Sequence, residues 1–359
     1  MENFVGENYV QPIIFGNSQG NSADFATAQA NKTAGSIKKF TITTVKDYAL
    51  ASIDNETILA SKNNSGAFMS AVSFATDGAF AQASRSLAGA VYGSGSGKLG
   101  QVVSSYTTGT TITLSQASDI VNFEVGMRIN FAVAETGGSV IVTQPTISNI
   151  DRDAGSFVVS DATSVLADHY IYRDGDYDLK LKGLEAWLPG SAVTSASYFG
   201  VDRSVDKSRL AGIIYDGSTA PIEEVVISAA ARLAREGGKP THLFMSYEKF
   251  AELEKSLGSK VQYVDLKAAN ADIGFRGIVI NGPRGPIKVI ADQNCAHNRA
   301  YMLQLDTWKL VSRGPAPQIL NMDNLDKLRD ASADSVELRI GSYLNLCCSA
   351  PGWNCKISF

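Results

Sequence analysis

The spacing of apolar residues changes along this chain, and each change predicts a different kind of element. Across residues 37–53 apolar and polar positions alternate, which predicts extended chain. Two strands bent at Lys46–Asp47 would form a long hairpin there, and because an isolated hairpin is marginally stable in water, it needs a surface to lie on. Across residues 67–91 small and aromatic residues recur every three or four positions, which predicts one long helix that the glycine run 93–97 ends.

The residues before this stretch carry little apolar pattern. Residues 17–22 consist mostly of Asn, Ser and Gly, and residues 24–32 are long enough for one short alanine-rich helix, which Gly35–Ser36 breaks. A segment of this composition cannot build a core of its own. We expect it to be disordered or to be ordered by another subunit.

The rest of the chain mixes the two periods. Short β-prone runs separated by Gly, Asp and Asn fill residues 99–174 and predict a small barrel or sandwich. Residues 221–236 have Pro and Glu near the start and Arg near the end, which predicts a helix whose dipole is compensated by these charges. A strand, a second helix from Ser246 to about Leu257, further strands and a long terminal strand follow. The sequence therefore predicts an α+β protein.

Composition and charge argue against several classes of function. The net charge is −4 and no basic tail or stripe is present, so the chain is not expected to wrap nucleic acid by electrostatics. The N-terminus has no signal-peptide pattern, and no apolar run reaches the length of a membrane span. Four irregularly spaced cysteines are expected to be buried, reduced thiols of a chain made in cytoplasm: Cys295, Cys347, Cys348 and Cys355.

Two motifs imitate ligand sites. Gly95, Gly97 and Gly100 form a literal G-x-G-x-x-G, but they follow a predicted helix and precede strands, the reverse of the order in a dinucleotide site. The segment 174–185 spaces its acidic residues like a calcium loop, yet Leu179 stands where the loop needs glycine. The residues LKLKGLEAW look extended rather than helical, so an Asp-Gly hairpin turn explains this segment better. We expect no cofactor and no metal ion at either place.

No catalytic constellation stands out either. Only His297 lies near a cysteine, Cys295, and a Cys/His pair needs a third group that orients the base. No such group can be named from the sequence, and neither G-x-S-x-G nor H-E-x-x-H occurs. We therefore expect a protein that is not an enzyme.

The order of the elements resembles the Hong Kong 97-type capsid fold of tailed-bacteriophage major capsid proteins. The stretches KDYALASIDNETILASK, GLEAWLP and THLFMSYEKFAEL resemble such proteins, and so does the closing succession GPIKVIAD, NRAYMLQLDTWKL and VELRIGSYLNL. The resemblance covers nearly the whole chain. It divides the chain as follows: N-terminal arm 1–36, extended loop 37–56, spine helix of the peripheral domain 57–92, inserted β-rich domain 93–175, peripheral domain 176–220, axial domain 221–316, and return to the peripheral domain 317–359.

What this resemblance implies is a shell subunit of a virion capsid, assembled in the cytoplasm of a bacterial host. Copies of the chain would form pentamers and hexamers, with a separate scaffolding protein, a portal and a decoration or cement protein as further partners. Packaged DNA would be met only through non-specific contact, and no membrane would be involved. The arm and loop would reach other subunits through these residues: Ile13, Ile14, Phe15, Ile37, Lys38, Lys39, Phe40, Ile42, Val45, Lys46 and Tyr48.

Members of the family can join lysine to asparagine between subunits. The loop contains Lys38, Lys39 and Lys46, but a solvated or ion-paired face explains them, and we expect no covalent crosslink. Two alternatives remain open. An encapsulin uses the same fold to build a compartment, and a dinucleotide-dependent enzyme would use Gly95, Gly97 and Gly100.

Overall fold

The structure is a computed structural model, and it divides the chain into two compact units. It describes residues 2–56, 65–141, 144–189, 193, 197–258, 278–321, 328–329 and 333–359, with the backbone alone for 65–73. Unit 1 consists of Met1–Glu7, Thr44–Gly183 and Leu310–Leu346, and unit 2 of Asn8–Thr43, Leu184–Lys309 and Cys347–Phe359. None of the described helices is both long and apolar enough to cross a membrane.

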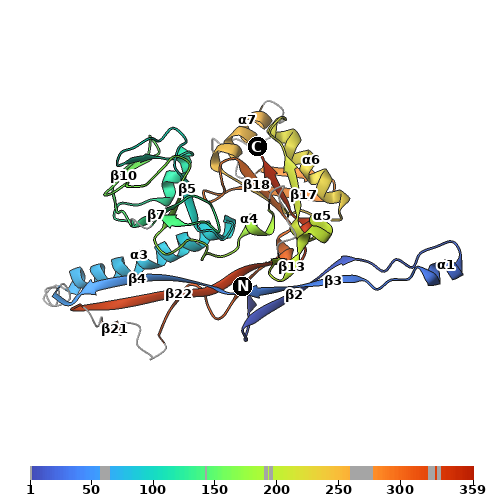
Figure 1. Ribbon diagram of the computed structural model, residues 1–359, viewed down its shortest axis with the longest axis horizontal. Coiled ribbons are helices and arrows are strands. Elements are labelled where there is room, and N and C mark those ends of the chain that lie inside the picture. The colour runs from blue at the N-terminus through green and yellow to red at the C-terminus, as the bar shows by residue number, and fades with distance from the viewer. Residues whose placement is uncertain are drawn as a thin grey trace, which may run out of the picture. The chain divides into compact units, whose positions relative to one another are not determined.

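One long helix packs against the main sheet of unit 1. Figure 1 shows it lying along two long strands, which pair antiparallel from Asp54↔Ser335 to Val45↔Leu344. Small residues such as Ala79 on the helix and Ala49 and Ala51 on one strand pack with Leu338 and Ile340 of the other, because short side chains let helix and sheet approach closely. The predicted long helix is confirmed. These elements are α3 (Ser65–Tyr92), β4 (Val45–Asp54) and β22 (Ser335–Cys348).

Shorter strands complete this sheet on the other side of β22. The N-terminal strand runs parallel to β19, with Glu2 beside Val311, and two further strands pair antiparallel with β22. The added strands are β1 (Glu2–Asn3), β19 (Trp308–Ser312), β20 (Gln318–Ile319) and β21 (Leu328–Arg329).

The β-rich region of unit 1 forms two small sheets around one core. Side chains from both sheets meet there, and the rings of Phe123 and Phe157 stack with centroids 4.8 Å apart. Single bridges, Val102↔Leu114 and Arg128↔Thr146, link the loops between strands. The predicted β-rich character is confirmed. The sheets have the orders β6-β10-β9 and β5-β11-β7-β8, from β5 (Lys98–Gln101), β6 (Thr111–Thr113), β7 (Ile129–Ala132), β8 (Val140–Ile141), β9 (Ile147–Asp151), β10 (Ser156–Val159) and β11 (Tyr170–Arg173), with the 3-10 helix η1 (Ala117–Asn122).

The segment after β11 differs from the prediction. A turn does form at Gly175, which has φ +83°, but the residues that follow, described throughout, continue as turns and coil rather than as the second strand of a hairpin. The predicted extended run then ends in a one-turn helix, α4 (Leu184–Trp187), not in a strand. Gly183 lies so close to the end of α3 that an added Cβ would be 2.2 Å from the Val91 carbonyl oxygen, so no side chain fits where the segment passes the helix end.

Unit 2 contains a six-stranded mixed sheet with two helices on one face. Val225, Val226 and Leu233 of the first helix pack against alternate strand residues such as Leu243 and Val289. The predicted helices and strands of this region are confirmed. The sheet order is β14-β23-β18-β15-β17-β16, from β14 (Ile213–Asp216), β15 (His242–Met245), β16 (Ile278–Gly282), β17 (Gly285–Ala291), β18 (Arg299–Leu303) and β23 (Cys355–Ser358), and the helices are α6 (Ile222–Arg235) and α7 (Tyr247–Gly258).

A second structural feature of unit 2 is a long hairpin near the N-terminus, and it corrects the predicted pairing. The stretch 37–53 is extended as predicted, but β3 does not pair with β4. β3 pairs with β2 from the segment predicted to be an arm, from Asn8↔Thr43 to Gly16↔Ser36, and β4 belongs to unit 1. The hairpin consists of β2 (Asn8–Gly16), α1 (Phe25–Ala30) at its far end in Figure 1, and β3 (Ser36–Thr43).

Small elements at the base of this hairpin connect it to the rest of unit 2. Thr41 donates its backbone N–H to the carbonyl oxygen of Phe199, beside a two-stranded turn. The two strands of this turn are β12 (Ser197–Tyr198) and β13 (Val201–Asp202). The other small elements of the chain are α5 (Lys207–Ala211) and the 3-10 helices η2 (Arg203–Asp206), η3 (Leu305–Thr307) and η4 (Pro351–Trp353).

Candidate assembly surfaces

The β2–β3 hairpin has one buried and one exposed face, because successive strand side chains point to opposite sides. Ile13, Phe40 and Ile42 lie on the inner face and are at most 4% exposed. The Phe40 ring lies 5.2 Å from that of Trp187, between ring centroids. These three residues, predicted as assembly contacts, are therefore core residues of unit 2.

Arg203 packs against the aromatic rings of this core. Its guanidinium lies 3.9 Å from the centroid of the Tyr198 ring and donates to the carbonyl oxygens of Ala186 and Trp187 at 2.9 and 3.3 Å. Burial lowers the pKa of Arg203, while the nearby Tyr198 phenol acts in the opposite direction. The base of the hairpin is consequently held by packing and by a buried cation.

The other face of the hairpin, here called the outer hairpin face, is apolar and open. Ile14 and Ile37 face each other across the two strands and are 70% and 55% exposed. Val10 and Pro12 lie on the same face of β2, and Lys39 lies opposite Pro12. Sequence analysis identified Ile14, Ile37 and Lys39 but missed Val10 and Pro12, although their alternation with Ile14 is itself a strand pattern. Of the other predicted residues here, Phe15 and Lys38 are half-buried.

The tip of the hairpin carries a short capped helix with no buried residue. Asp24 accepts hydrogen bonds from the backbone N–H and the hydroxyl of Thr27 at 2.9 and 2.8 Å, which lower the pKa of this carboxyl. Phe25, in the first turn, is 81% exposed. A large aromatic ring that is exposed on a well-formed helix suggests a contact surface. Sequence analysis predicted the helix and missed this residue.

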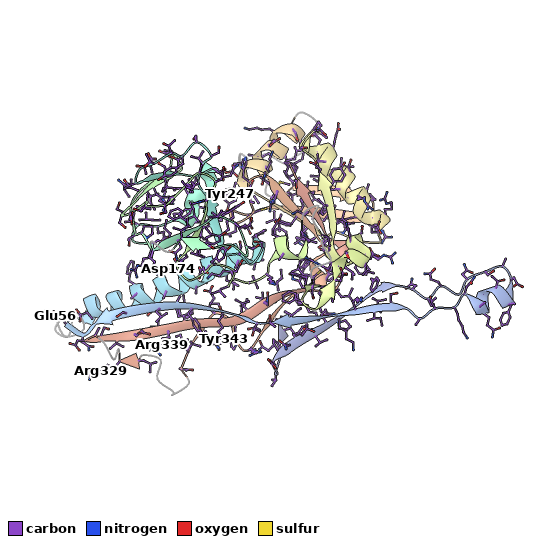
Figure 2. The ribbon with its side chains drawn as sticks, in the orientation of Figure 1. Glu56, Asp174, Tyr247, Arg329, Arg339 and Tyr343 are labelled. Carbon is purple, nitrogen blue, oxygen red and sulfur yellow. The ribbon has the colours of Figure 1, made fainter. Side chains whose placement is uncertain are left out.

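A second open surface lies on the strands of unit 1. Lys46, Tyr48 and Leu50 of β4 point away from α3, whereas Val45 is half-buried on the opposite face. Tyr48 meets Tyr343 of β22 edge-on, with ring centroids 6.0 Å and hydroxyl oxygens 3.4 Å apart. Figure 2 labels Tyr343 and Arg339 along β22. Sequence analysis proposed Lys46 and Tyr48 as contacts but could not find their neighbours on β22, which come from the far end of the chain.

A polar cluster fastens the inner face of β4 to the helix. The Lys180 ammonium lies 2.8 Å from an Asp47 carboxylate oxygen and 3.1 Å from one of Asp176, and Ser86 of α3 donates to Asp47 at 2.7 Å. Burial raises the pKa of Asp176, and the attraction of Lys180 only partly opposes this. Because desolvation prevails, we infer that the Asp176 carboxylate is not itself stabilising here, whereas Lys180 and Asp47 are well paired.

A corresponding cluster lies in unit 2. Glu185, in α4, accepts from the Lys356 ammonium at 2.8 Å, from the Arg299 guanidinium at 2.6 Å and from the Tyr301 hydroxyl at 2.9 Å. Lys356 is 3% exposed, so its charge has little access to water. One carboxylate thus ties α4 to β18 and β23.

The motifs that imitate enzyme sites have structural explanations. Gly95 and Gly97 have φ of +92° and +80°, and an added Cβ at Gly97 would lie 2.6 Å from the Asp176 carbonyl oxygen. The run therefore connects α3 to β5, and it packs tightly against the loop that contains Asp176. All four cysteines are buried and reduced, as predicted, and burial raises the pKa of the Cys295 thiol to about 12. His297 faces Glu248 at 3.7 Å, and Cys295 lies near the carbonyl oxygen of Arg299 at 3.4 Å, so this thiol has no activated thiolate character.

Comparison with known proteins places this fold. No protein-family model matches the chain, and no curated protein matches it by sequence. Among solved structures, a chain of the cyanophage A-1(L) capsid asymmetric unit matches with TM-score 0.59 and 14% identity, over 99% of this chain and 89% of that one. Chains of an empty GTA particle capsid (TM-score 0.45, 10% identity, 100% and 87% covered) and of Gordonia phage Cozz (TM-score 0.45, 11% identity, 99% and 84% covered) also match. The cyanophage match shows that the fold is one that a phage capsid chain adopts.

Proposed function

We propose that this chain is the major capsid protein of a tailed bacteriophage, a structural subunit that assembles into an icosahedral head around packaged double-stranded DNA and catalyses no reaction. The observation that carries the proposal is the likeness in fold to a phage capsid chain over 99% of this chain. The open apolar surfaces of both units support it, because a monomer gains nothing from exposing them whereas a shell subunit buries them against its neighbours.

In the Hong Kong 97-type plan, the helix α3 with β4 and β22 serves as spine helix and peripheral domain. The β-rich region within 93–175 serves as an inserted module, and the unit 2 sheet with α6 and α7 serves as the axial domain. The β2–β3 hairpin is the better candidate for the extended loop than residues 37–56, because β3 pairs with β2 and β4 does not take part. The boundary between arm and loop then moves to about Asn8.

The outer hairpin face is the surface we assign to a neighbouring subunit. Each aliphatic side chain that is fully buried on assembly contributes about 1.5–3 kcal/mol. Val10, Ile14 and Ile37 are 52%, 70% and 55% exposed, so each contributes roughly half to two thirds of this amount. Phe25, 81% exposed, adds an aromatic ring at the tip. The second open surface, with Tyr48, Leu50 and Tyr343, is suited to a further contact of the same kind.

The assembled partners follow from this role. Copies of the chain form pentamers and hexamers, and a separate scaffolding protein directs their closure. A portal occupies one vertex and a decoration protein binds the outside, while packaged DNA meets the shell without sequence specificity. The mature location is the virion capsid, after assembly in the cytoplasm of a bacterial host.

Electron microscopy of the expressed chain, alone and with a candidate scaffolding protein, tests the proposal. Closed shells of the size of a phage head are the expected result. Discrete monomers or dimers under both conditions would contradict it. Small uniform cages would instead favour an encapsulin, and the neighbouring genes give an independent answer: portal and terminase genes accompany a capsid protein, and a cargo enzyme accompanies an encapsulin.

A further inference from the structure

Unit 2 gathers three exposed cations at the end of α6, although the sequence contains no basic run. Arg235 lies in the last turn of that helix, and Lys239 follows it in the loop that leads to β15. Arg284 comes from the tight turn between β16 and β17. All three residues are exposed, and we call them the basic patch.

Tertiary contacts hold the end of α6 and the β16–β17 turn together. Gly237, with φ of +96°, turns the chain after the helix, and its carbonyl oxygen accepts a hydrogen bond from the Arg284 guanidinium at 2.6 Å. A Cβ added at Gly285 would lie 3.7 Å from the Cε of Lys239, and one added at Gly237 would lie 3.7 Å from the Nε1 of Trp353, which is 41% exposed. The patch thus joins segments that are 47 positions apart in the chain.

Two carboxylates lie near these cations, and one of them is already paired. The Glu236 carboxylate lies 2.7 Å from the Arg232 guanidinium. The Gln304 side chain accepts from the backbone N–H of Lys239 at 2.9 Å and donates to Asp306 at 3.2 Å, which places the second carboxylate beside the patch. A single carboxylate is therefore left to oppose the charge of the three cations.

The basic patch forms no ion pair within the part of the chain that the structure describes, since none of its three residues has an anionic partner there. Lys288, which is exposed on β17, extends the positive charge along the sheet. It lies opposite His242, and burial together with the charge of Lys288 lowers the pKa of that histidine. The region is positive although the whole chain has a net charge of −4.

We propose that the basic patch binds the phosphate backbone of packaged double-stranded DNA. Arginine and lysine donate hydrogen bonds to phosphate oxygens without reading the base sequence, so such a contact needs only cations that are free to meet them. Arg284 and Lys239 contact Gly237 and Gly285 rather than a cluster of apolar side chains, which favours a phosphate backbone over a folded protein partner. The inference rests on the proposed capsid function, which supplies the DNA.

The salt dependence of DNA binding by the unassembled, full-length chain tests the patch. Each phosphate that a cation neutralises contributes about −0.9 to the slope of the logarithm of the binding constant against the logarithm of the salt concentration, so three contacts predict a slope of about −2.7 for a short labelled duplex. Lys239→Gln should reduce the magnitude of this slope by about 0.9, and Arg235→Gln/Lys239→Gln by about 1.8.

Two control variants separate the patch from general charge. Lys239→Arg keeps the cation and should keep the slope. Lys32→Gln removes an exposed lysine near the tip of the β2–β3 hairpin, and it should leave the slope unchanged because that residue is not part of the patch. Thermal unfolding checks that all variants fold.

The outcomes separate this inference from the proposed function. No binding by the wild-type chain, an unchanged slope in the double variant, or an equal loss in Lys32→Gln would overturn the patch while leaving shell formation untouched. Displacement of the DNA by poly-glutamate at the same concentration of charges would assign the patch to an acidic protein segment and overturn the DNA contact. Absence of shells in electron microscopy would overturn the capsid function, whereas the predicted slopes of the unassembled chain would still support phosphate binding by the patch.

Discussion

Replacing Glu185 by glutamine should destabilise unit 2 strongly, because it removes the one anion among two cations. Lys356 would lose the carboxylate 2.8 Å from its ammonium while remaining 3% exposed, and Arg299 would lose its partner at 2.6 Å. Removing one partner of a buried ion pair costs about 3–5 kcal/mol. The Arg299 side chain is 35% exposed, so water compensates part of its loss and the lower end, about 3 kcal/mol, is expected.

This change can be measured by urea unfolding of the full-length, unassembled chain, with circular dichroism as the signal. With a slope of about 3 kcal/mol per molar urea, a loss of about 3 kcal/mol moves the midpoint down by about 1 M. The matched control is Glu224→Gln in the first turn of α6, which removes an exposed carboxylate that only compensates the helix dipole and should cost less than about 1 kcal/mol.

A double variant shows whether the unpaired charge is the cause. In Glu185→Gln/Lys356→Met the buried ammonium is gone as well, so at least half of the lost stability should return. A single-variant loss below about 1 kcal/mol, or a double variant less stable than the single one, would refute the reasoning.

Three further predictions address other parts of the chain. Ile14→Asp/Ile37→Asp should prevent shell formation without lowering the melting temperature of the unassembled chain, whereas Ile14→Val/Ile37→Val should assemble; equal particle yields in electron microscopy would contradict the role of the outer hairpin face. The pKa of Asp176 is raised above its ordinary value of 3.8 by burial, so the folded state binds this proton more tightly and the stability that it provides is lost as pH rises through the raised pKa. Asp176→Asn should therefore gain stability relative to wild type as pH rises above 3.8, and a difference that stays constant with pH in urea unfolding would be evidence against the assignment. Purified shells should run as a monomer on a denaturing gel, because Lys38, Lys39 and Lys46 are not expected to crosslink; a ladder of covalent multimers would disprove this.

Local periodicity was sufficient for most of the elements. The three-to-four-residue spacing of α3, the amphipathic pattern of α6 and the alternation in β3 and β4 each depend on which side of one element is apolar, and consecutive residues show this. The same holds for α1, where Asp24 and a following alanine-rich run suffice. Element order also predicted that the run with Gly95 and Gly97 is a connection between a helix and a strand, and it lies between α3 and β5.

The sequence alone could not determine which strands pair with each other. Alternation shows that a strand has an apolar face but not which strand lies beside it, so β3 and β4 could pair with each other as well as with β2 and β22. The packing of Phe40 against Trp187 and of Ala49 against α3 decided between these pairings, and both contacts join residues far apart in the chain. The same contacts turned Ile13, Phe40 and Ile42 into core residues and left Val10, Ile14 and Ile37 on the open face. The sequence by itself therefore determined the elements and their apolar faces, and only the tertiary structure decided which of those faces are buried within the chain, because burial depends on contacts that no local pattern encodes.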